Sequence, residues 1–336
     1  MMFLKGIGAL LLTLAAFSVF SLKFPKGDKA MGALADAAVT TFLVEAIFKY
    51  ICGDFIGIAF LGQVGAASGS MGAVAAAALV GLAMGMSPVF VIAAAVAVSG
   101  CGILTGFLVA YILSFFLERC IKILPAGLDI IVGTLATAAI ARGIAVLVDP
   151  AVNTVISTVG DSIIAATTQS PLVMGLVLGG IMKIVCTSPL SSMALTAMMG
   201  LTGLPMGIAA VACFGGAFSN AVIFKMLKLG DNSRVLAVIL EPLTQADIIT
   251  RYPIPIYCSS FVGGAMSGVV AATLQIVNDA PGTASTIPGL LAPFAFNDPM
   301  TVITAMGIAL VCGIVGGLAV AVFFKKIGWK VRSFKM

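Results

Sequence analysis

The sequence predicts an all-α, polytopic membrane protein, and three observations lead to this fold class. Of the 336 residues, 61% are hydrophobic and only 9% are charged, with a mean hydropathy of +1.20. A typical soluble domain has roughly 25% charged residues. The apolar residues occur in runs separated by short charged, Pro-rich or Gly-rich segments, as expected for membrane helices and their loops. The 38 glycines lie largely within these runs, which predicts close helix packing through small-xxx-small pairs.

The first half of the chain begins with an apolar run over residues 3–22. We expect a retained first span there, because the run is long for a signal peptide and no A-x-A-like site ends it. Residues 30–50 form either a helix with one buried face or a partly interfacial segment, since Asp36, Glu45 and Lys49 interrupt the run. The Gly- and Ser-rich residues 55–72 are a candidate re-entrant segment, and 73–86 form the next apolar run.

Two later segments define the expected domain boundary. Residues 89–117 are too long for one straight span, so they form either a long tilted helix or two segments broken near Gly100 and Gly102. Residues 128–148 are a further span, ended by Asp149-Pro150. The amphipathic stretch 152–168 is typical of an interfacial connector. We therefore expect an N-terminal scaffold and dimerisation domain over 1–168 and a transport domain over 169–336.

The second half holds shorter apolar runs between polar breaks. The expected helical runs cover 171–185, 194–200, 206–224, 257–277 and 300–324, whereas 287–296 is too short to cross a bilayer. Asn297 and Asp298 are expected to cap the last span. The basic tail after Phe324 predicts a cytoplasmic C-terminus. The whole chain is expected to span the membrane about ten times, counting two re-entrant hairpins separately.

One polar break, at Glu241, is the best candidate for a solute site. Glu241 lies in an apolar run directly before Pro242, and proline disfavours helix at the residue that precedes it. A carboxylate at a backbone break inside a bilayer is tolerated mainly where it lines a cavity. The alternative is a helix-end carboxylate at the membrane interface. Thr244 and Gln245 follow it and are predicted either to contact the solute or to pack the hairpin.

A second break has a similar order of residues. Ser188-Pro189-Leu190-Ser191 resembles Glu241-Pro242-Leu243-Thr244 in its sequence of polar, proline, leucine and hydroxyl residues. Paired Pro-interrupted segments are found at the binding sites of transporters with internal repeats. Thr187, Ser188 and Ser191 therefore either cap this break or contact the solute. We expect hairpins near 187–203 and 239–255 whose breaks face one polar cavity.

Other charged residues have simpler interpretations. Asp247 and Arg251 are four residues apart, so a local ion pair is expected if this stretch is helical. Arg142 and Lys183 either pair within the bundle or lie at its interfaces. The chain has no histidine, and its seven cysteines include no C-x-x-C pair. We therefore predict no catalytic residue, no metal site and no cofactor, and the net charge of +5 is attributed to cytoplasmic loops rather than to nucleic-acid binding.

The second half also resembles a known family, the membrane (enzyme IIC) component of the sugar phosphotransferase system in its glucose superfamily. The resemblance covers about residues 171–329 and agrees in order and spacing. Within this family the chain is most similar to the perfringolysin O regulator-like members, which lack attached IIA and IIB domains. The matching motifs are Gly203-Leu204-Pro205 with the small residues after it, Leu240-Glu241-Pro242, Pro255, Gly263 to Gly268, and Ile287-Pro288-Gly289-Leu290.

This resemblance implies an elevator-type transport domain on a homodimeric scaffold in a bacterial inner membrane. It also implies that Glu241 contacts a sugar and that a separate IIB protein, served by IIA, transfers the phosphate, so this chain is not itself an enzyme. The sequence departs from the family where Thr244 and Gln245 follow Leu243 in place of a second glutamate, and where the sugar-binding histidine of many members is missing.

Three functions therefore stay open from the residues alone. The first is a permease for a small polar solute, a sugar by the resemblance. The second is an ion-coupled carrier of another polar or anionic solute, with Glu241 or Asp247 as the proton or cation site. The third is a membrane regulator or sensor that kept the fold without transport.

Overall fold

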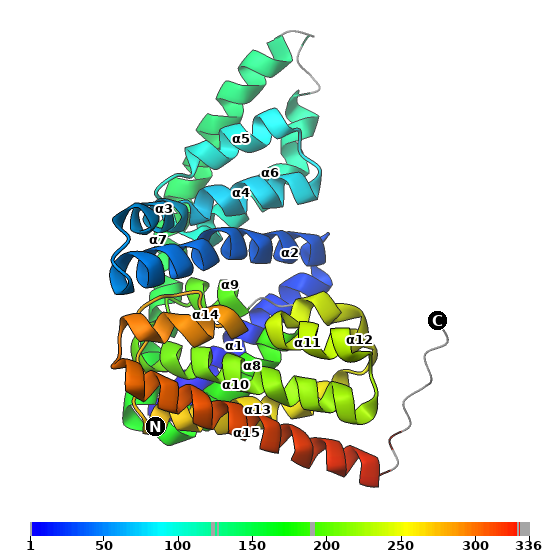
Figure 1. The fold of residues 1–336 in the computed structure, drawn as a ribbon. Helices are drawn as coiled ribbons and strands as arrows, with labels where there is room; N and C mark the ends of the chain where they lie inside the picture. Colours follow the sequence, from blue (N-terminus) through cyan, green and yellow to red (C-terminus); the bar gives the residue numbers. More distant parts are fainter. Residues whose placement is uncertain (1, 122–124, 126–127, 189–191, 328, 330–336) are drawn as a thin grey trace. The chain divides into compact units, whose positions relative to one another are not determined.

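The computed structural model describes residues 2–121, 125, 128–188, 192–327 and 329, and this part of the chain is helical without any β-strand (Figure 1). In chain order the helices are α1 (Met2–Lys23), α2 (Gly27–Ala38), η1 (Val39–Leu43), η2 (Glu45–Phe55), α3 (Ala59–Gly69), α4 (Gly72–Met84), α5 (Pro88–Ala97), α6 (Ile103–Ile121), α7 (Leu128–Gln169), α8 (Pro171–Thr187), α9 (Ser192–Met198), α10 (Gly203–Leu227), α11 (Asn232–Leu240), η3 (Pro242–Gln245), α12 (Ala246–Arg251), α13 (Pro253–Thr273), α14 (Thr286–Leu291), η4 (Ala292–Ala295) and α15 (Pro299–Lys326).

Several of these helices are long and apolar enough to cross a bilayer. Among the described residues there are six such segments, or seven if the bent pair α3 and α4 forms one span. The six cover residues 4–23, 27–55, 128–169, 203–227, 253–273 and 299–326. This supports the polytopic membrane class, while about ten spans and two re-entrant hairpins stay predictions.

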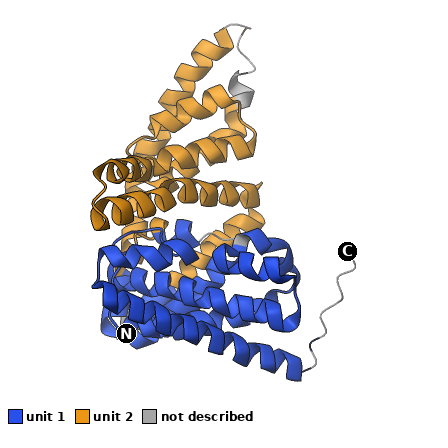
Figure 2. Ribbon diagram, viewed as in Figure 1, with its two compact units in different colours: residues 1–8, 162–196, 201–336 blue, residues 9–161, 197–200 orange. Residues whose placement is uncertain are grey.

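The chain divides into two compact units (Figure 2). Unit 1 comprises residues 1–8, 162–196 and 201–336, and unit 2 comprises residues 9–161 and 197–200. One division falls between Asp161 and Ser162, inside α7, and the boundary expected after residue 168 stays a prediction. The scaffold and transport roles of the two halves stay predictions.

The prediction that Asp149-Pro150 ends a span is wrong. α7 runs without interruption for 42 residues and contains Pro150, so residues 152–168 belong to it and are not a separate connector. The reason lies in the partners of Asp149. Its carboxylate accepts hydrogen bonds from the backbone N–H of Gly102 (3.1 Å) and the hydroxyl of Thr105 (2.6 Å) at the start of α6, and from Asn153 (2.8 Å) in the next turn. These bonds fix the helix where proline removes one backbone donor.

The structure decides one open alternative in unit 2 and narrows another. Residues 89–117 form two helices, α5 and α6, separated near Gly100, which has a positive φ of 81°. Arg142 of α7 donates to the carbonyl oxygens of Ala97 and Ser99 and so completes the C-terminal end of α5. Residues 27–55 form one helical segment through α2, η1 and η2, and α2 has a buried face that includes Ala30, Leu34 and Ala37; a partly interfacial position of this segment stays a prediction.

Unit 1 is built around α10, whose side chains are mostly buried against α8, α13, α14 and α15. Glycines bring α8 and α13 into backbone contact. A Cβ atom on Gly175 or Gly179 would lie 2.7 Å from the carbonyl oxygen of Gly268 or Gly264, respectively, which is closer than real Cβ contacts. The small-xxx-small pairs Gly175/Gly179 and Gly264/Gly268 therefore form one helix interface, in agreement with the close packing expected from glycines within the apolar runs.

Candidate solute-binding site

Both predicted proline breaks end a helix in unit 1. α8 ends at Thr187, and Ser188 after it is extended (φ −84°, ψ 167°); α11 ends at Leu240, and Glu241 after it is extended (φ −150°, ψ 101°). In each case the next residue is a proline, which cannot donate a backbone hydrogen bond and which disfavours helix at the residue before it. The local conformation of Ser188 and Glu241 thus follows directly from the sequence.

The two breaks lie near each other in unit 1. α8 is in contact with η3, the short helix that begins directly after Glu241. The half-buried Glu241 lies close enough to the thiol of Cys186, in the last turn of α8, to interact with it electrostatically. The structure therefore brings Glu241 to the end of α8. Ser191 lies outside the described residues.

Local hydrogen bonds hold the backbone around Glu241. The backbone N–H of Thr244 (3.2 Å) and its hydroxyl (2.7 Å) both donate to the carbonyl oxygen of Glu241. The side chain of Gln245 donates to the Thr244 hydroxyl (3.1 Å) and accepts from Arg234 (3.2 Å). Of the two alternatives for Thr244 and Gln245, these contacts match packing of the hairpin.

The partner of Asp247 differs from the expected one. Asp247 forms an ion pair with Arg234 of α11 (2.8 Å), and not the predicted local pair with Arg251. The hairpin folds α12 back beside the start of α11, which places the Arg234 guanidinium between Asp247 and Gln245. Beneath this pair, Val238, Ile248 and Ile249 pack against an apolar cluster with Phe224 of α10 and Phe324 of α15.

A buried polar cluster surrounds the end of α8. The hydroxyl of Thr187 accepts a hydrogen bond from the side-chain amide of Asn220 of α10 (2.9 Å). Ser260 of α13 donates to the other end of the same amide (2.8 Å) and lies 3.1 Å from Thr187. All three side chains are 0% exposed. The cluster therefore joins three helices through satisfied polar groups, which is what a buried polar network requires.

Two of the hydroxyl residues at this break bond backbone carbonyl groups of α8. Thr187 donates to the carbonyl oxygen of Lys183 (2.9 Å), and Ser188 donates to that of Val185 (2.8 Å). The Ser188 hydroxyl thus adds a second donor to the Val185 carbonyl group in the last turn of α8, whereas the Thr187 hydroxyl bonds back to a carbonyl group one turn earlier in the same helix. That either hydroxyl also contacts a solute stays a prediction.

Lys183 lies one turn before Thr187 and is 0% exposed. Its stem lies between Gly216 of α10 and Gly264 of α13, where a Cβ atom on either glycine would overlap it. Its ammonium group donates to the carbonyl oxygen of Cys213 (3.2 Å) and lies 4.0 Å from the sulfur of Cys186. Within the described part of the chain, no carboxylate lies within ion-pair distance of this charge.

Sequence reasoning missed several polar residues of this region. Asn220 and Ser260 sit in apolar helical runs, and their only sequence signal was a polar residue among small ones. Thr286, at the start of α14, is 4% exposed, and its hydroxyl is the only buried side-chain polar atom without a hydrogen-bond partner among the described residues. α14 contacts α11, the helix that ends before Glu241.

The loop before α14 explains the Gly203-Leu204-Pro205 motif. Gly203 has a positive φ of 64°, a conformation that glycine adopts without strain. Its N–H donates to Asp279 (2.9 Å), and its carbonyl oxygen accepts from the N–H of Asn278 (3.0 Å). Nearby, Ser192 of α9 donates to the carbonyl oxygen of Ala284. The motif therefore fixes the start of α10 against the loop over residues 276–285.

The residues expected to cap the last span have separate roles. Asp298 caps α15 by accepting from the N–H of Thr301 (3.0 Å), as predicted. Asn297 instead accepts from the N–H of Val277 (3.0 Å) and donates to its carbonyl oxygen (2.7 Å). Among the described residues no group of three or more His, Cys, Asp or Glu side chains is arranged to hold a metal ion.

Comparison with known proteins identifies the class. A family model described as "Phosphotransferase system, EIIC" matches residues 28–335, which is nearly the whole chain. The chain therefore belongs to the EIIC family of the phosphotransferase system, the permease-type membrane components. Neither a curated protein nor a solved structure matched the chain. EIIC proteins are transporter components that are not catalytic on their own and work with IIB and IIA components.

Proposed function

We propose that this protein is the permease for a small polar solute, a sugar, and that Glu241 contacts the solute directly. The observation that carries the proposal is the position of Glu241: it is half-buried, at a break in helical bonding, and beside the end of α8. A carboxylate accepts hydrogen bonds from sugar hydroxyls, and bonds to a charged group are the stronger ones. Membership of the family supports the function of a phosphotransferase permease. The Glu-Pro motif supports Glu241 as the residue that contacts the solute.

Hydrogen-bonding groups around Glu241 support the same site. Thr244 fixes the Glu241 carbonyl, so we assign Thr244 and Gln245 the role of positioning the break. The hydroxyl of Thr286 has no partner among the described residues, and a buried polar atom in that state calls for a ligand or a water. We assign Thr286 as a further solute contact, reached through the packing of α14 on α11.

The proposed transport cycle combines movement of the solute by this chain with phosphorylation of the solute by a partner. The break regions 187–203 and 239–255 act as two re-entrant hairpins in an elevator-type domain, and the protein works as a homodimer in a bacterial inner membrane. A separate IIB protein, which IIA phosphorylates, transfers the phosphoryl group to a hydroxyl of the solute. This chain binds and orients the solute, and the perfringolysin O regulator-like members are its expected relatives.

One observation favours a second candidate, an ion-coupled carrier. Lys183 is a fully buried ammonium group whose hydrogen-bond acceptor is a single carbonyl oxygen, with a thiol nearby. Ionisable residues inside membrane proteins often mark ion or proton pathways. In this candidate, Lys183 and Glu241 serve the coupling ion, and transport needs no phosphate donor. No observation favours the regulator that lacks transport.

The test begins with the identity of the solute. The purified protein is screened against sugars, amino sugars and organic acids by thermal shift, since a bound solute raises the melting temperature. Uptake of the best solute is then measured in vesicles with and without IIB and a phosphate donor. Accumulation of the phosphorylated solute, dependent on IIB, is expected. Uptake driven by a proton gradient without any donor supports the carrier instead, and binding without uptake supports the regulator.

The first testable prediction concerns Glu241→Gln, which keeps the shape of the side chain and removes its charge. Loss of a hydrogen bond to a charged group is expected to weaken solute binding by about 1.5–3 kcal/mol, which is roughly ten- to a hundred-fold in Kd. Calorimetry on wild type and variant measures this. Glu45→Gln is the matched control, because Glu45 pairs with Lys49 in unit 2 (3.0 Å).

The same measurement also decides between roles. Thr286→Val is expected to weaken binding by a smaller factor than Glu241→Gln while the protein stays folded. Equal affinity for wild type and a folded Glu241→Gln variant contradicts direct contact and makes Glu241 a structural or ion-coupling residue.

A further inference from the structure

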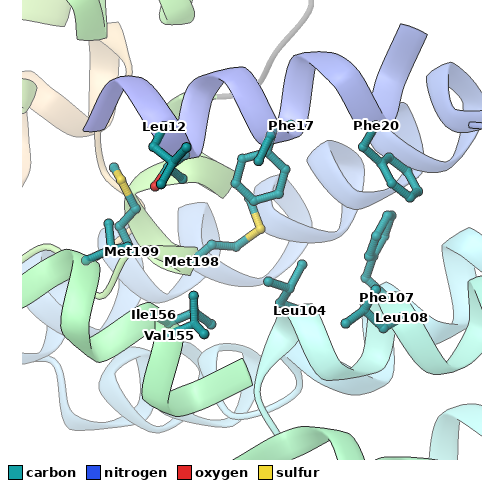
Figure 3. Close-up of a pocket in the computed structure, with 13 residues that line it drawn as sticks. Leu12, Phe17, Phe20, Leu104, Phe107, Leu108, Val155, Ile156, Met198 and Met199 are labelled. Atoms are coloured by element: carbon teal, nitrogen blue, oxygen red, sulfur yellow. The ribbon is translucent and has the colours of Figure 1, made fainter. Parts of the chain in front are cut away.

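Unit 2 contains a cavity that the transport function does not use. It has a volume of about 360 Å³, within the range of pockets that bind small molecules. Figure 3 shows Leu12, Phe17 and Phe20 of α1 on one side and Leu104, Phe107 and Leu108 of α6 on the other. Val155 and Ile156 of α7, together with Met198 and Met199, complete the wall.

The lining is apolar, which restricts the chemistry of any ligand. Thr13 is the single hydroxyl residue among the lining residues, and its hydroxyl donates to the carbonyl oxygen of Ala9 within the same helix (2.8 Å). A sugar placed here would lose its hydrogen bonds to water without replacement, and each unpaired polar group is costly. The cavity therefore fits a hydrocarbon ligand and not the transported solute.

The cavity reaches from the surface to the interior. Leu12 on its wall is 71% exposed, whereas Phe107 and Met199 are each 2% exposed. In a membrane protein an exposed leucine on an apolar helix faces lipid. A hydrocarbon chain from the surrounding bilayer can therefore enter the cavity sideways, beside Leu12.

The stretch of α1 that lines the cavity is about as long as one leaflet is thick. α1 carries a candidate span over Leu4–Lys23, and its lining residues run from Leu12 to Phe20. At 1.5 Å per residue these eight steps cover about 12 Å, close to the roughly 15 Å that one leaflet contributes to the hydrocarbon core. Three of the five α1 lining residues thus lie in the half of the span that ends at Lys23, and the other two lie at its middle.

An aromatic group marks the end of the cavity nearer Lys23. The ring of Phe20 packs against Phe107 (centroids 5.3 Å apart) and Tyr111 (5.0 Å apart). The Tyr111 hydroxyl donates to the carbonyl oxygen of Pro25 (2.9 Å), in the loop that follows α1. Tyrosine with an apolar body and a bonded polar tip is typical of the membrane–water interface.

Basic residues follow directly. Lys23 is three residues after Phe20, so both lie on the same face of α1. The segment 23–29 contains Lys23, Lys26 and Lys29, all exposed, with Asp28 as its one acidic residue. Lys26 also donates to the carbonyl oxygen of Met84 (3.1 Å). By the positive-inside rule this loop is cytoplasmic, and the cytoplasmic leaflet carries the anionic lipids.

We propose that this cavity binds one acyl chain of an anionic glycerophospholipid, whose phosphate is held by Lys23 and Lys29. The apolar lining contacts the acyl chain. Phe20, Phe107 and Tyr111 lie at the level of the ester linkages, and the two lysines form ion pairs with the phosphate. The site is independent of which solute the protein carries.

Native mass spectrometry tests the proposal on the purified full-length protein with added phosphatidylglycerol or phosphatidylcholine of identical acyl chains. Wild type is expected to retain phosphatidylglycerol in preference to phosphatidylcholine. Ala16→Trp, which fills the cavity, is expected to lower phosphatidylglycerol occupancy at least several-fold. Ala15→Trp is the matched control, because Ala15 is exposed and does not line the cavity. If Ala16→Trp does not fold, Leu108→Trp on the facing helix replaces it.

A second pair of variants tests the headgroup. Lys23→Gln with Lys29→Gln is expected to weaken phosphatidylglycerol binding by roughly thirty-fold, at about five-fold for each lysine near a membrane surface. Lys325→Gln with Lys326→Gln removes the same charge from the end of α15 and is expected to leave binding unchanged. Equal retention by Ala16→Trp and wild type overturns the proposal, as does equal retention of the two lipids. A third result also overturns it: Ala16→Trp breaks a protein dimer but keeps its bound lipid. In that case a second copy of the chain, and not a lipid, occupies the cavity of the wild-type protein.

Discussion

The two proline-terminated helix ends of unit 1 have similar sequences but different surroundings. At the end of α8, Thr187 and Ser188 are 0% and 8% exposed, and neutral side chains from α10 and α13 satisfy the polar groups there. At the end of α11, the hairpin is held by an ion pair whose side chains, Arg234 and Asp247, are 40% and 54% exposed. One end is thus fixed by buried neutral bonds, and the other by a charge pair that water and salt reach.

This difference predicts that disrupting the two helix ends lowers the free energy of unfolding by unequal amounts. The largest effect is expected for Asn220→Leu, which removes the amide that bonds both Thr187 and Ser260. Side-chain hydrogen bonds within membrane proteins contribute about 0.6 kcal/mol on average and up to about 1.7. The loss of two such bonds is expected to lower the free energy of unfolding by about 1–3 kcal/mol.

Denaturant unfolding in detergent measures this change. Ser267→Ala is a useful control, because its hydroxyl is equally buried but bonds the backbone carbonyls of Gly263 and Ala309 outside the cluster. A loss for Asn220→Leu no larger than that for Ser267→Ala contradicts a special role for the buried cluster.

A smaller effect is expected at the other end, from Arg234→Gln. Exposed ion pairs contribute about 0.2–1 kcal/mol, and salt screens them. The variant is therefore expected to lose less than about 1 kcal/mol of stability, and the loss should shrink as salt is raised from low to high concentration. A double-mutant cycle with Asp247→Asn isolates the pair. A coupling energy that does not respond to salt is evidence that this end is also effectively buried.

The smallest effect on stability is expected for Thr244→Val. This change removes the bond from an exposed hydroxyl to the carbonyl oxygen of Glu241, together with the bond that the same hydroxyl accepts from Gln245, and should cost about 0.5 kcal/mol. Solute affinity is expected to fall more than stability does, because the bond orients the break that carries Glu241. Thr244→Ser keeps the hydroxyl and should restore affinity. If both variants bind solute as wild type does, Thr244 has no positioning role.

The sequence predicted the helix ends better than the contacts between helices. α8 and α11 both end at the predicted proline breaks, because proline acts on its immediate neighbours. Asp149-Pro150 is also a polar residue followed by proline, yet the helix does not end there. Gly102 and Thr105, more than 40 positions away, bind the aspartate and keep α7 continuous. That partnership depends on how α6 folds against α7.

The candidate site shows the same limit. Glu241 was found because a carboxylate before a proline in an apolar run is unusual in itself. Asn220 and Ser260 were not found, since pairing between side chains on different helices leaves no periodic pattern in either helix. The partner of Asp247 was mispredicted for a related reason: the i,i+4 rule considers one helix, whereas Arg234 reaches Asp247 across the hairpin.

The glycine contact between α8 and α13 restricts how the site can move. Because the carbonyl oxygens of Gly264 and Gly268 face Gly179 and Gly175 with no room for a side chain, the two helices fit together in a single register. Sliding by one helical turn, about 5.4 Å, would replace Gly179 or Gly175 at the contact with a bulkier residue such as Lys183. Any displacement of Thr187 must therefore carry Ser260 with it, because the two residues lie on helices that this contact joins.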